Sequence, residues 1–114
     1  MSKSDLVRLR HMLDATGEAL SFVSGKTRED LNGDRMLILS CIRLLEIIGE
    51  AASQVSPQFR AGYPDLPWNQ MIGMRHRLIH SYFDINLDVL WETLTDSLPA
   101  LVPALEKILE DQQG

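Results

Sequence analysis

Apolar residues recur at helical spacing along almost the whole chain. The first stretch carries a stripe in steps of three, four or seven residues, formed by Leu6, Leu9, Leu13, Leu20 and Val23. Ser4 is a suitable N-cap for this helix, and Gly25 is a suitable C-terminal stop. Thr27 and Asp30 have the spacing of a capping arrangement. They predict a short helical turn that ends near Asn32-Gly33.

A long second helix is predicted from about Asp34 to Val55. Its apolar residues cover most of its circumference: Met36, Leu37, Leu39, Cys41, Leu44, Leu45, Ile47, Ile48, Ala51 and Ala52. A helix of this kind lies at the centre of a bundle or at an interface between subunits. We expect both roles here, and the pattern therefore predicts a homodimer.

The second half of the chain is punctuated by prolines. Ser56-Pro57 has the form of an N-cap and first helical residue, which predicts a short helix from Pro57 to Ala61. Residues 62–67 contain Pro64 and Pro67 and cannot form a regular helix. The next helix is predicted to run from Pro67 to about His80 or Tyr82.

A break at residues 84–86 precedes the last helix, for which Asn86 is the expected N-cap. Pro99 and Pro103 lie within its apolar pattern and should kink it, or split it near Ser97. No stretch alternates strongly enough to predict a strand. We therefore expect an all-α fold, an antiparallel helical bundle of four to six helices that forms a single domain over residues 1–114.

Composition narrows the protein class. The single cysteine, Cys41, excludes an intramolecular disulfide, and its apolar surroundings predict a buried thiol. The charged start of the chain does not resemble a signal peptide. The longest apolar stretch, Met36 to Ile48, is too short and too charged to span a membrane. No membrane association is predicted, and the cytoplasm is the expected compartment.

The net charge of −5 argues against indiscriminate binding to nucleic acid. The charge is unevenly distributed, however. Residues 60–83 carry three arginines against one aspartate, whereas residues 84–114 carry one lysine against seven acidic residues. The positive stretch suits a local site for an anionic ligand.

The same stretch holds the densest chemistry, with two arginines, two histidines and a tyrosine between Arg75 and Tyr82. His76 and His80 have the four-residue spacing of metal ligands on a helix. However, Arg77 follows His76 where a zinc protease helix has glutamate, and no nearby carboxylate or cysteine completes a set. Ser81 lacks the context of an activated nucleophile. Neither a metal ion nor any other cofactor is expected.

Chemistry on a phosphodiester fits these residues better. Arginine clamps phosphate and stabilises the charge that develops on its oxygens. Histidine titrates near neutral pH and can transfer protons. In RNA the 2′-hydroxyl is itself a nucleophile, so Arg75 and His80 are a minimal set. The alternative is that His80 and Tyr82 are half-buried polar residues at a helix end and that the two arginines are solvated.

The spacing of Arg75, His80 and Tyr82 resembles the Arg-x4-His-x-Tyr motif of HepT-type toxins in the HEPN superfamily. Flanking segments resemble this family in order and spacing across roughly residues 5 to 110. They are Leu45 to Ala52, Ser56-Pro57, Pro67-Trp68, Ile72 to Arg75, Phe83-Asp84 and Trp91. The chain departs from the family at His76, where asparagine often follows the arginine.

The resemblance implies a dimeric helical bundle with the motif at a cleft between protomers. It also implies metal-independent cleavage of RNA, restrained by an MNT-type nucleotidyltransferase antitoxin. By position, Arg75 would stabilise the phosphate and His80 would act as acid or base, with His76 and Arg77 in supporting roles. Tyr82 would be the tyrosine that the partner modifies with a nucleotide.

Helix geometry leaves one question open. On an ideal helix His80 lies about 140° from Arg75, so one straight helix does not place both on the same face. Either the helix loosens near His80, or a second protomer completes the site. A different kind of function also remains open, namely a non-catalytic helical dimer that binds a nucleotidyltransferase or a nucleotide.

Overall fold

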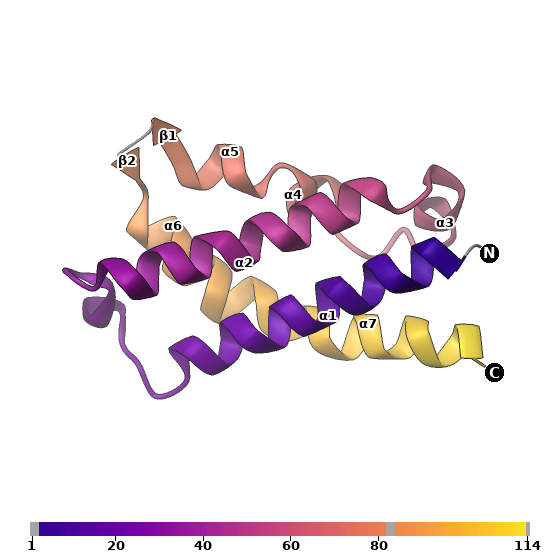
Figure 1. The fold of residues 1–114 in the computed structure, drawn as a ribbon, viewed down its shortest axis with the longest axis horizontal. Helices are drawn as coiled ribbons and strands as arrows, with labels where there is room; N and C mark the ends of the chain where they lie inside the picture. Colours follow the sequence, from indigo (N-terminus) through magenta and orange to yellow (C-terminus); the bar gives the residue numbers. More distant parts are fainter. Residues whose placement is uncertain (1–2, 82–83, 114) are drawn as a thin grey trace.

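The computed structural model describes residues 3–81 and 84–113. Its α-helices are α1 (Lys3–Val23), α2 (Arg35–Gln54), α3 (Pro57–Gly62), α4 (Trp68–Ile72), α5 (Met74–Leu78), α6 (Leu87–Glu92) and α7 (Leu98–Gln113), and the predicted helical turn after α1 is a 3-10 helix, Arg28–Leu31. Two short strands, β1 (Ile79–Ser81) and β2 (Asp84–Ile85), lie between α5 and α6. Figure 1 shows α1 and α2 as the longest helices, with α7 beside α1. The predicted all-α class is confirmed.

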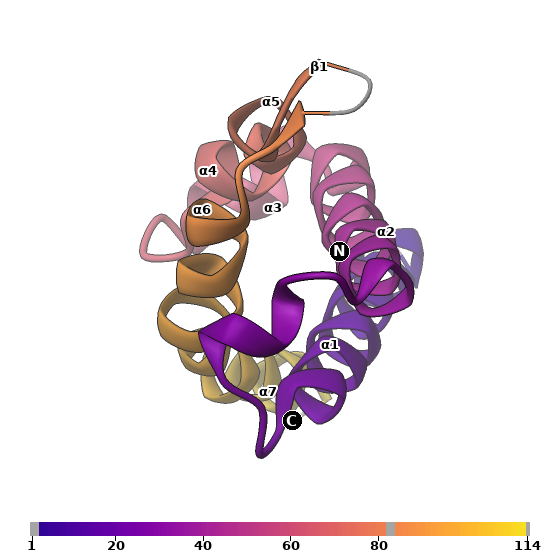
Figure 2. The same cartoon turned by 90° about the vertical axis from the view of Figure 1, so that its left-hand side faces the viewer.

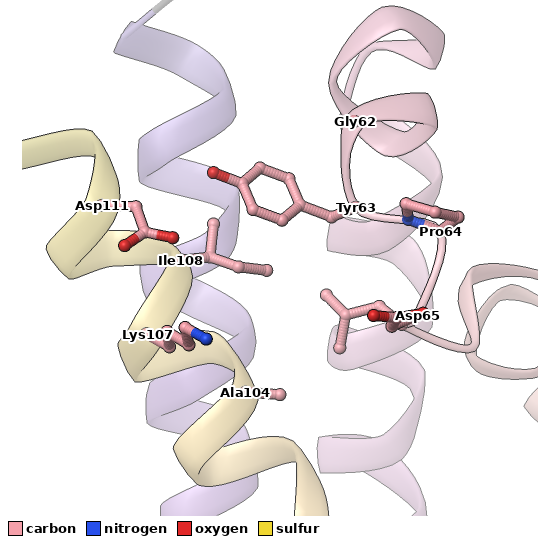
Figure 3. A pocket seen from close by; sticks show the side chains of 9 residues that line it. Gly62, Tyr63, Pro64, Asp65, Ala104, Lys107, Ile108 and Asp111 are labelled. Atoms are coloured by element: carbon pink, nitrogen blue, oxygen red, sulfur yellow. The ribbon is translucent and has the colours of Figure 1, made fainter.

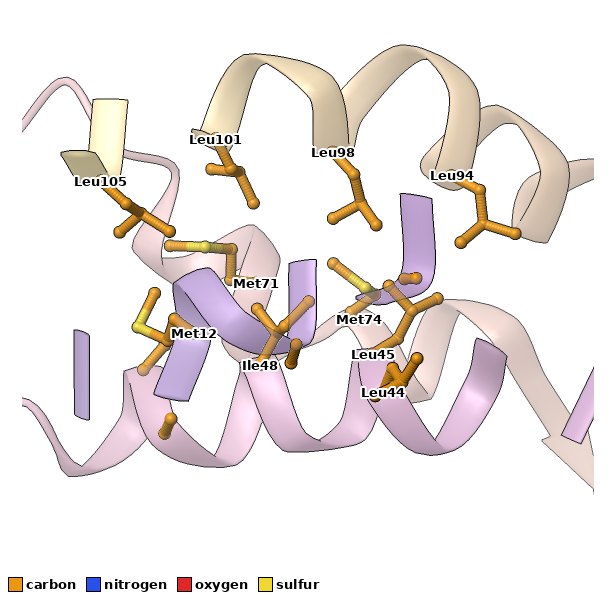
Figure 4. Close-up of a cluster of buried hydrophobic side chains, with 14 of the residues drawn as sticks. Met12, Leu44, Leu45, Ile48, Met71, Met74, Leu94, Leu98, Leu101 and Leu105 are labelled. Carbon is orange, nitrogen blue, oxygen red and sulfur yellow. The ribbon is translucent and has the colours of Figure 1, made fainter. Parts of the chain in front are cut away.

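The core lies between α1 and α2 on one side and the last third of the chain on the other. Four leucines of the last third, at positions 94, 98, 101 and 105, point towards Met12 of α1 and towards Leu45, Ile48, Met71 and Met74 (Figure 4). Leu94, Leu98 and Leu105 are completely buried. Helix α2 therefore has the central position that its apolar pattern predicts.

Side-chain caps begin α2, α3 and α6 at the predicted positions. The side chain of Asp34 accepts a hydrogen bond from the backbone N–H of Leu37 at 3.0 Å, that of Ser56 from Phe59 at 3.3 Å, and that of Asn86 from Val89 at 3.1 Å. Gly25 has a φ of +75°, in the left-handed region, and follows the end of α1 closely. One predicted cap is wrong, because α1 begins at Lys3 and Ser4 lies inside it.

The helix predicted from Pro67 to about His80 is wrong in its length. The chain forms two five-residue helices instead, α4 and α5, with Gly73 between them. The Gly73 N–H still bonds to the carbonyl of Asn69 at 2.9 Å, as in a helix, but Gly73 caps α4 and α5 begins at the next residue. Glycine costs about 1 kcal/mol in a helix interior relative to alanine, which favours an interruption there.

The prediction of no strand is also wrong, for a short stretch. Strand β1 pairs with β2 in antiparallel fashion, with Ile79 opposite Ile85. The N–H of Asn86 donates to the carbonyl of Leu78, the last residue of α5, at 2.9 Å. In a continuing helix the Leu78 carbonyl would accept a hydrogen bond from the next turn. Here it accepts one from the returning chain instead. This pair lies at one corner of the bundle, beyond α5 (Figure 2).

The expected disturbance near Ser97 is present as a π-helical segment, Thr93–Ser97, between α6 and α7. The N–H of Leu98 reaches back five residues to the carbonyl of Thr93. Pro99 is the next residue and has no backbone N–H to donate. The π-helical segment therefore lies where the series of α-helical hydrogen bonds is interrupted. The last helix is therefore divided near Ser97 by the π-helical segment, whereas Pro103 lies inside α7 without interrupting it.

Cys41 is completely buried, as predicted. Burial, and then the negative charge of Asp34, raise the pKa of its thiol to about 11. In the described part of the chain, every helix is either too short or too polar to cross a membrane.

Candidate functional site

The motif residues lie where α5 gives way to the strand pair. Arg75 is the second residue of α5, and His80 is the middle residue of β1. Tyr82 lies outside the described residues. Because α5 ends at Leu78, Arg75 and His80 do not share one straight helix. Of the two alternatives left open by helix geometry, the loosening of the helix before His80 is therefore present.

Two apolar anchors hold α5 against the core. Met74 is 5% exposed and Leu78 is 1% exposed, and they lie one helical turn apart on the same face. His76 and Arg77 lie between them in sequence and are exposed. Helix α5 is thus held to the core on one face, while His76 and Arg77 are exposed to solvent.

The packing of α2 against α4, beside the site, depends on a glycine in α2. A Cβ atom at Gly49 would lie 2.7 Å from the backbone carbonyl oxygen of Met71 in α4. No side chain fits into that space, so Gly49 allows α2 and α4 to pack with their backbones nearly in contact. This close approach explains the glycine within the segment Leu45 to Ala52.

A hollow of about 250 Å³ lies between α2 and the α4–α5 pair, next to the motif. Arg43, Glu46, Glu50 and Ser53 of α2 line it together with His76, and its apolar wall comes from Leu45, Gly49, Met71 and Ile72. His76 is therefore the motif-segment residue that the described structure places in a cavity with charged side chains.

Arg43 and Glu50 are site candidates that the sequence did not reveal. They precede the motif by more than twenty residues and lie seven apart, two turns along α2. Both are exposed, on the side of α2 that turns away from its buried stripe. The sequence shows that both residues belong to the polar face of α2. It does not show which residues of that face line a cavity.

The metal interpretation of His76 and His80 loses its geometric basis. It required both residues on one helix, whereas His76 is in α5 and His80 is in β1. Among the residues that the structure describes, no three histidine, cysteine or acidic side chains are grouped so that they could hold a metal ion.

A second hollow, of about 270 Å³, lies far from the motif, near the two termini. Figure 3 shows Tyr63 and Pro64 on one side of it and Lys107, Ile108 and Asp111 of α7 on the other. The hydroxyl of Tyr63 already accepts a hydrogen bond of 2.7 Å from Gln112. The motif residues are distant from it, so the hollow beside His76 is the better candidate for the site.

Comparison with known proteins finds a matching family model and several similar chains. Residues 12–108 match the model of a family described as ribonuclease HepT-like. A probable ribonuclease HepT of Thermococcus cleftensis is 37% identical over 84% of this chain and 91% of its own length. A candidate RNase of Caldanaerobacter subterraneus subsp. tengcongensis is 35% identical over 92% of this chain and 94% of its own.

A third relative, a candidate RNase of Methanocaldococcus jannaschii, is 33% identical over 93% of this chain and 98% of its own length. No solved structure matches the chain significantly. The family match spans both the helical core and the segment from Arg75 to Tyr82. The chain therefore belongs to the ribonuclease HepT-like family and is an enzyme of the ribonuclease class.

Proposed function

We propose that this protein is the toxin of a toxin–antitoxin pair and a metal-independent RNA endonuclease of the cytoplasm, with Arg75 and His80 at its active centre. The observation that carries the proposal is the end of α5 at Leu78, which frees His80 from the helical geometry that would have separated it from Arg75. The family match supports the class of substrate.

The proposed reaction uses the 2′-hydroxyl of the RNA as nucleophile. Its oxygen attacks the adjacent phosphorus, the bond from phosphorus to the 5′-oxygen breaks, and the products are a 2′,3′-cyclic phosphate and a 5′-hydroxyl. His80 removes the proton of the 2′-hydroxyl or supplies one to the leaving 5′-oxygen. Arg75 binds the phosphate oxygens and stabilises the charge that they gain in the transition state.

Product analysis tests this proposal directly. A fluorescent single-stranded RNA should be cut in the presence of EDTA, and its 5′ fragment should end in a cyclic phosphate. His80→Ala, purified in the same way, controls for contaminating ribonucleases. Loss of cleavage on chelation, restored by a divalent ion, would contradict the metal-independent mechanism.

We further propose that the enzyme acts as a homodimer whose cleft contains the motif. Met36 is 82% exposed and Leu39 is 45% exposed on the outer side of α2, which is unusual for large apolar side chains. A second copy that covers them would lie close to the hollow beside His76, since Arg43 and Glu50 are on the same side of α2. A second protomer would also bring a second motif to the cleft.

Sedimentation velocity at micromolar concentration tests the dimer. The wild-type protein should sediment as a dimer, and Leu39→Asp should sediment as a folded monomer because an interfacial carboxylate loses its hydration. Glu110→Lys, an exposed change on α7, is the control. A monomeric wild type would remove both the dimer and the shared cleft.

The proposed antitoxin is an MNT-type nucleotidyltransferase that attaches a nucleotide to Tyr82. A phosphodiester on this tyrosine would add bulk and negative charge two residues from His80, where it would compete with the substrate phosphate for Arg75. Co-expression with the partner, followed by intact mass measurement, should show nucleotide adducts that are absent in Tyr82→Phe. Inhibition of an unmodified protein would instead indicate simple occlusion.

A further inference from the structure

The outer face of α2 carries a regular stripe of side chains that the fold of the single chain does not use. Helix α2 packs against α1 on one flank and against α4 and α5 on the other (Figure 2). The residues of the outer face recur every three or four positions, and they are Met36, Leu39, Arg43, Ile47, Glu50 and Gln54. We call this set the outer stripe. All of its members are exposed except Ile47, which is half-buried. A stripe of this period is the surface that one helix presents to another packed along it.

The outer stripe holds two opposite charges without a partner in the chain. Arg43 and Glu50 lie seven residues apart, about 10 Å along the helix axis, which is too far for them to pair with each other. Neither forms an ion pair or a side-chain hydrogen bond with any residue in the described part of the chain. Because the same stripe also exposes Met36 and Leu39, both its charges and its apolar groups are available to a second helix.

The two charges determine how a second copy of α2 could pack along the stripe. In a parallel two-fold pair each residue faces its own copy, so Arg43 would meet Arg43 and Glu50 would meet Glu50. In an antiparallel pair whose axis passes beside Ile47, Arg43 and Glu50 are almost equally far from the axis, on opposite sides of it. Arg43 of each copy then faces Glu50 of the other. Charge complementarity therefore favours the antiparallel orientation, with two equivalent ion pairs.

The charged neighbours that share a hollow with Glu50 agree with this arrangement. Glu46, which is half-buried, lies on the flank of α4 and α5 together with His76, whereas Arg8 and His11 lie on the flank of α1. With the histidines neutral, two carboxylates and one arginine give this part of the surface one net negative charge. Arg43 of a second copy would balance it.

The axis beside Ile47 also brings the two copies of Glu46 near each other. Each of them lies one helical turn from Arg43 of its own chain and, across the pair, about one turn from Arg43 of the other chain. The two arginines therefore offset the repulsion between these carboxylates, and Glu46 strengthens the attraction of each copy for Arg43 of the other.

The antiparallel orientation places both motif segments on the same side of the dimer. Its two-fold axis crosses the pair of α2 helices within their plane of contact, so the flank with α4 and α5 is on the same side in both copies. The axis meets α2 in the stretch that lines the hollow beside His76. The two hollows would therefore open next to each other, and each would be completed by a residue of the other copy.

We propose that the outer stripe of α2 binds the outer stripe of a second copy in antiparallel orientation, with Arg43 of each copy paired to Glu50 of the other. This inference rests on the proposed homodimer. It goes beyond that proposal because it gives the binding surface, the orientation and the residue, Arg43, that each copy contributes to the hollow of the other.

Single charge reversals distinguish the two orientations. Across an antiparallel pair, Arg43→Glu or Glu50→Lys would place like charges against each other twice, and should raise the dissociation constant of the dimer at least about 100-fold. In a parallel pair either change would only replace one pair of like charges by another, so the dissociation constant should stay the same. Sedimentation velocity over a series of protein concentrations measures it. Glu110→Lys, an exposed change on α7, is the matched control and should have no effect.

Mixing the two variants tests whether charge is the cause. In a mixed dimer of Arg43→Glu with Glu50→Lys, one of the two contacts has its wild-type charges and the other has both charges reversed, so opposite charges meet in both. A 1:1 mixture should therefore form a dimer within about ten-fold of the wild-type affinity, although neither variant dimerises well alone. Circular dichroism of each variant checks that the helices remain.

The possible results separate this interface from the proposals on which it rests. A monomeric wild type would contradict the homodimer and the interface together. A dimeric wild type that is unaffected by both charge reversals would overturn the antiparallel stripe and leave the homodimer in place. Weakened single variants that do not recover on mixing would show that the reversals do not act through the proposed ion pair. None of these measurements requires RNA, so the outcome does not depend on the proposed endonuclease mechanism.

Discussion

The helical frame formed by α1, α2 and α7 and the motif segment, residues 74–86, are built in different ways. The frame consists of helices of 21, 20 and 16 residues. The motif segment contains one helix of five residues and strands of three and two residues. Long helices gain most of their stability from a continuous buried stripe, whereas elements this short depend on a few tertiary contacts.

Because of this difference, substitutions in the frame and in the motif segment should affect different properties, namely stability and cleavage of RNA. In the frame, a change to a packed or hydrogen-bonded residue should alter the free energy of unfolding. In the motif segment, Met74 and Leu78 provide the attachment to the core, and His76 and Arg77 between them are exposed. Changes to the proposed catalytic residues should therefore alter cleavage far more than folding.

The largest expected effect is on cleavage at the motif. His80→Ala should lower the rate by at least about 100-fold, the usual contribution of a general acid or base. Arg75→Ala should behave similarly, and Arg75→Lys should not restore activity because lysine lacks the planar fork. Urea unfolding should show nearly unchanged stability. Variants that cut RNA at the wild-type rate would show that the assigned site is wrong, and unfolded variants would show that these residues are structural.

The next effect belongs to the contact between α2 of the frame and α4, the helix that precedes the motif segment. Gly49→Ala should lower the free energy of unfolding by about 1–3 kcal/mol, because the new Cβ atom overlaps the Met71 carbonyl oxygen. Gly17→Ala is a matched control in the middle of α1, where a Cβ atom would meet nothing within 4 Å. It should stabilise the protein by about 0.5–1 kcal/mol through helix propensity. Equal effects of the two changes would refute the proposed role of the close contact.

A hydrogen-bond site within the frame should give a similar or slightly smaller loss. Asp5 is 5% exposed and accepts hydrogen bonds of 2.8 Å from both the backbone N–H and the hydroxyl of Ser56. Asp5→Ala should cost about 1–3 kcal/mol because it leaves these donors without their acceptor. Asp14→Ala, an exposed change on the same helix, should cost much less. RNA cleavage by Asp5→Ala at a temperature where it is folded should be unchanged.

The smallest effect concerns Cys41 and depends on pH. Its folded-state pKa of about 11 is above that of a free thiol, so the native state retains the proton where the unfolded chain has lost it. This contribution to stability is fully present below the pKa of the free thiol and should disappear as the pH rises through the folded-state pKa. Cys41→Ala should show a weaker loss over that alkaline range. Rapid iodoacetamide labelling of the native protein near neutral pH would contradict the burial of the thiol.

The same comparison explains what the sequence could predict. Ser56, Asn86 and Gly25 act on residues next to them, so their caps and stops follow from the sequence alone. The pairing of Ile79 with Ile85 could not be predicted in this way, because three residues are too few to show an alternating pattern. Likewise, Arg43 lines the hollow beside His76 because α2 packs against α4 and α5, which are distant from it in the sequence. The motif residues themselves could be selected by their chemistry and spacing.

The described ends of the chain have a practical consequence for experiments. The start of α1 and the end of α7 lie together at one end of the molecule, and the strand pair that follows α5 lies towards the other (Figure 1). The longest dimension of the molecule is 45 Å. An affinity tag or a surface anchor joined to either end would therefore leave the end with the motif segment open to solution, so that immobilised protein can be used to measure RNA binding.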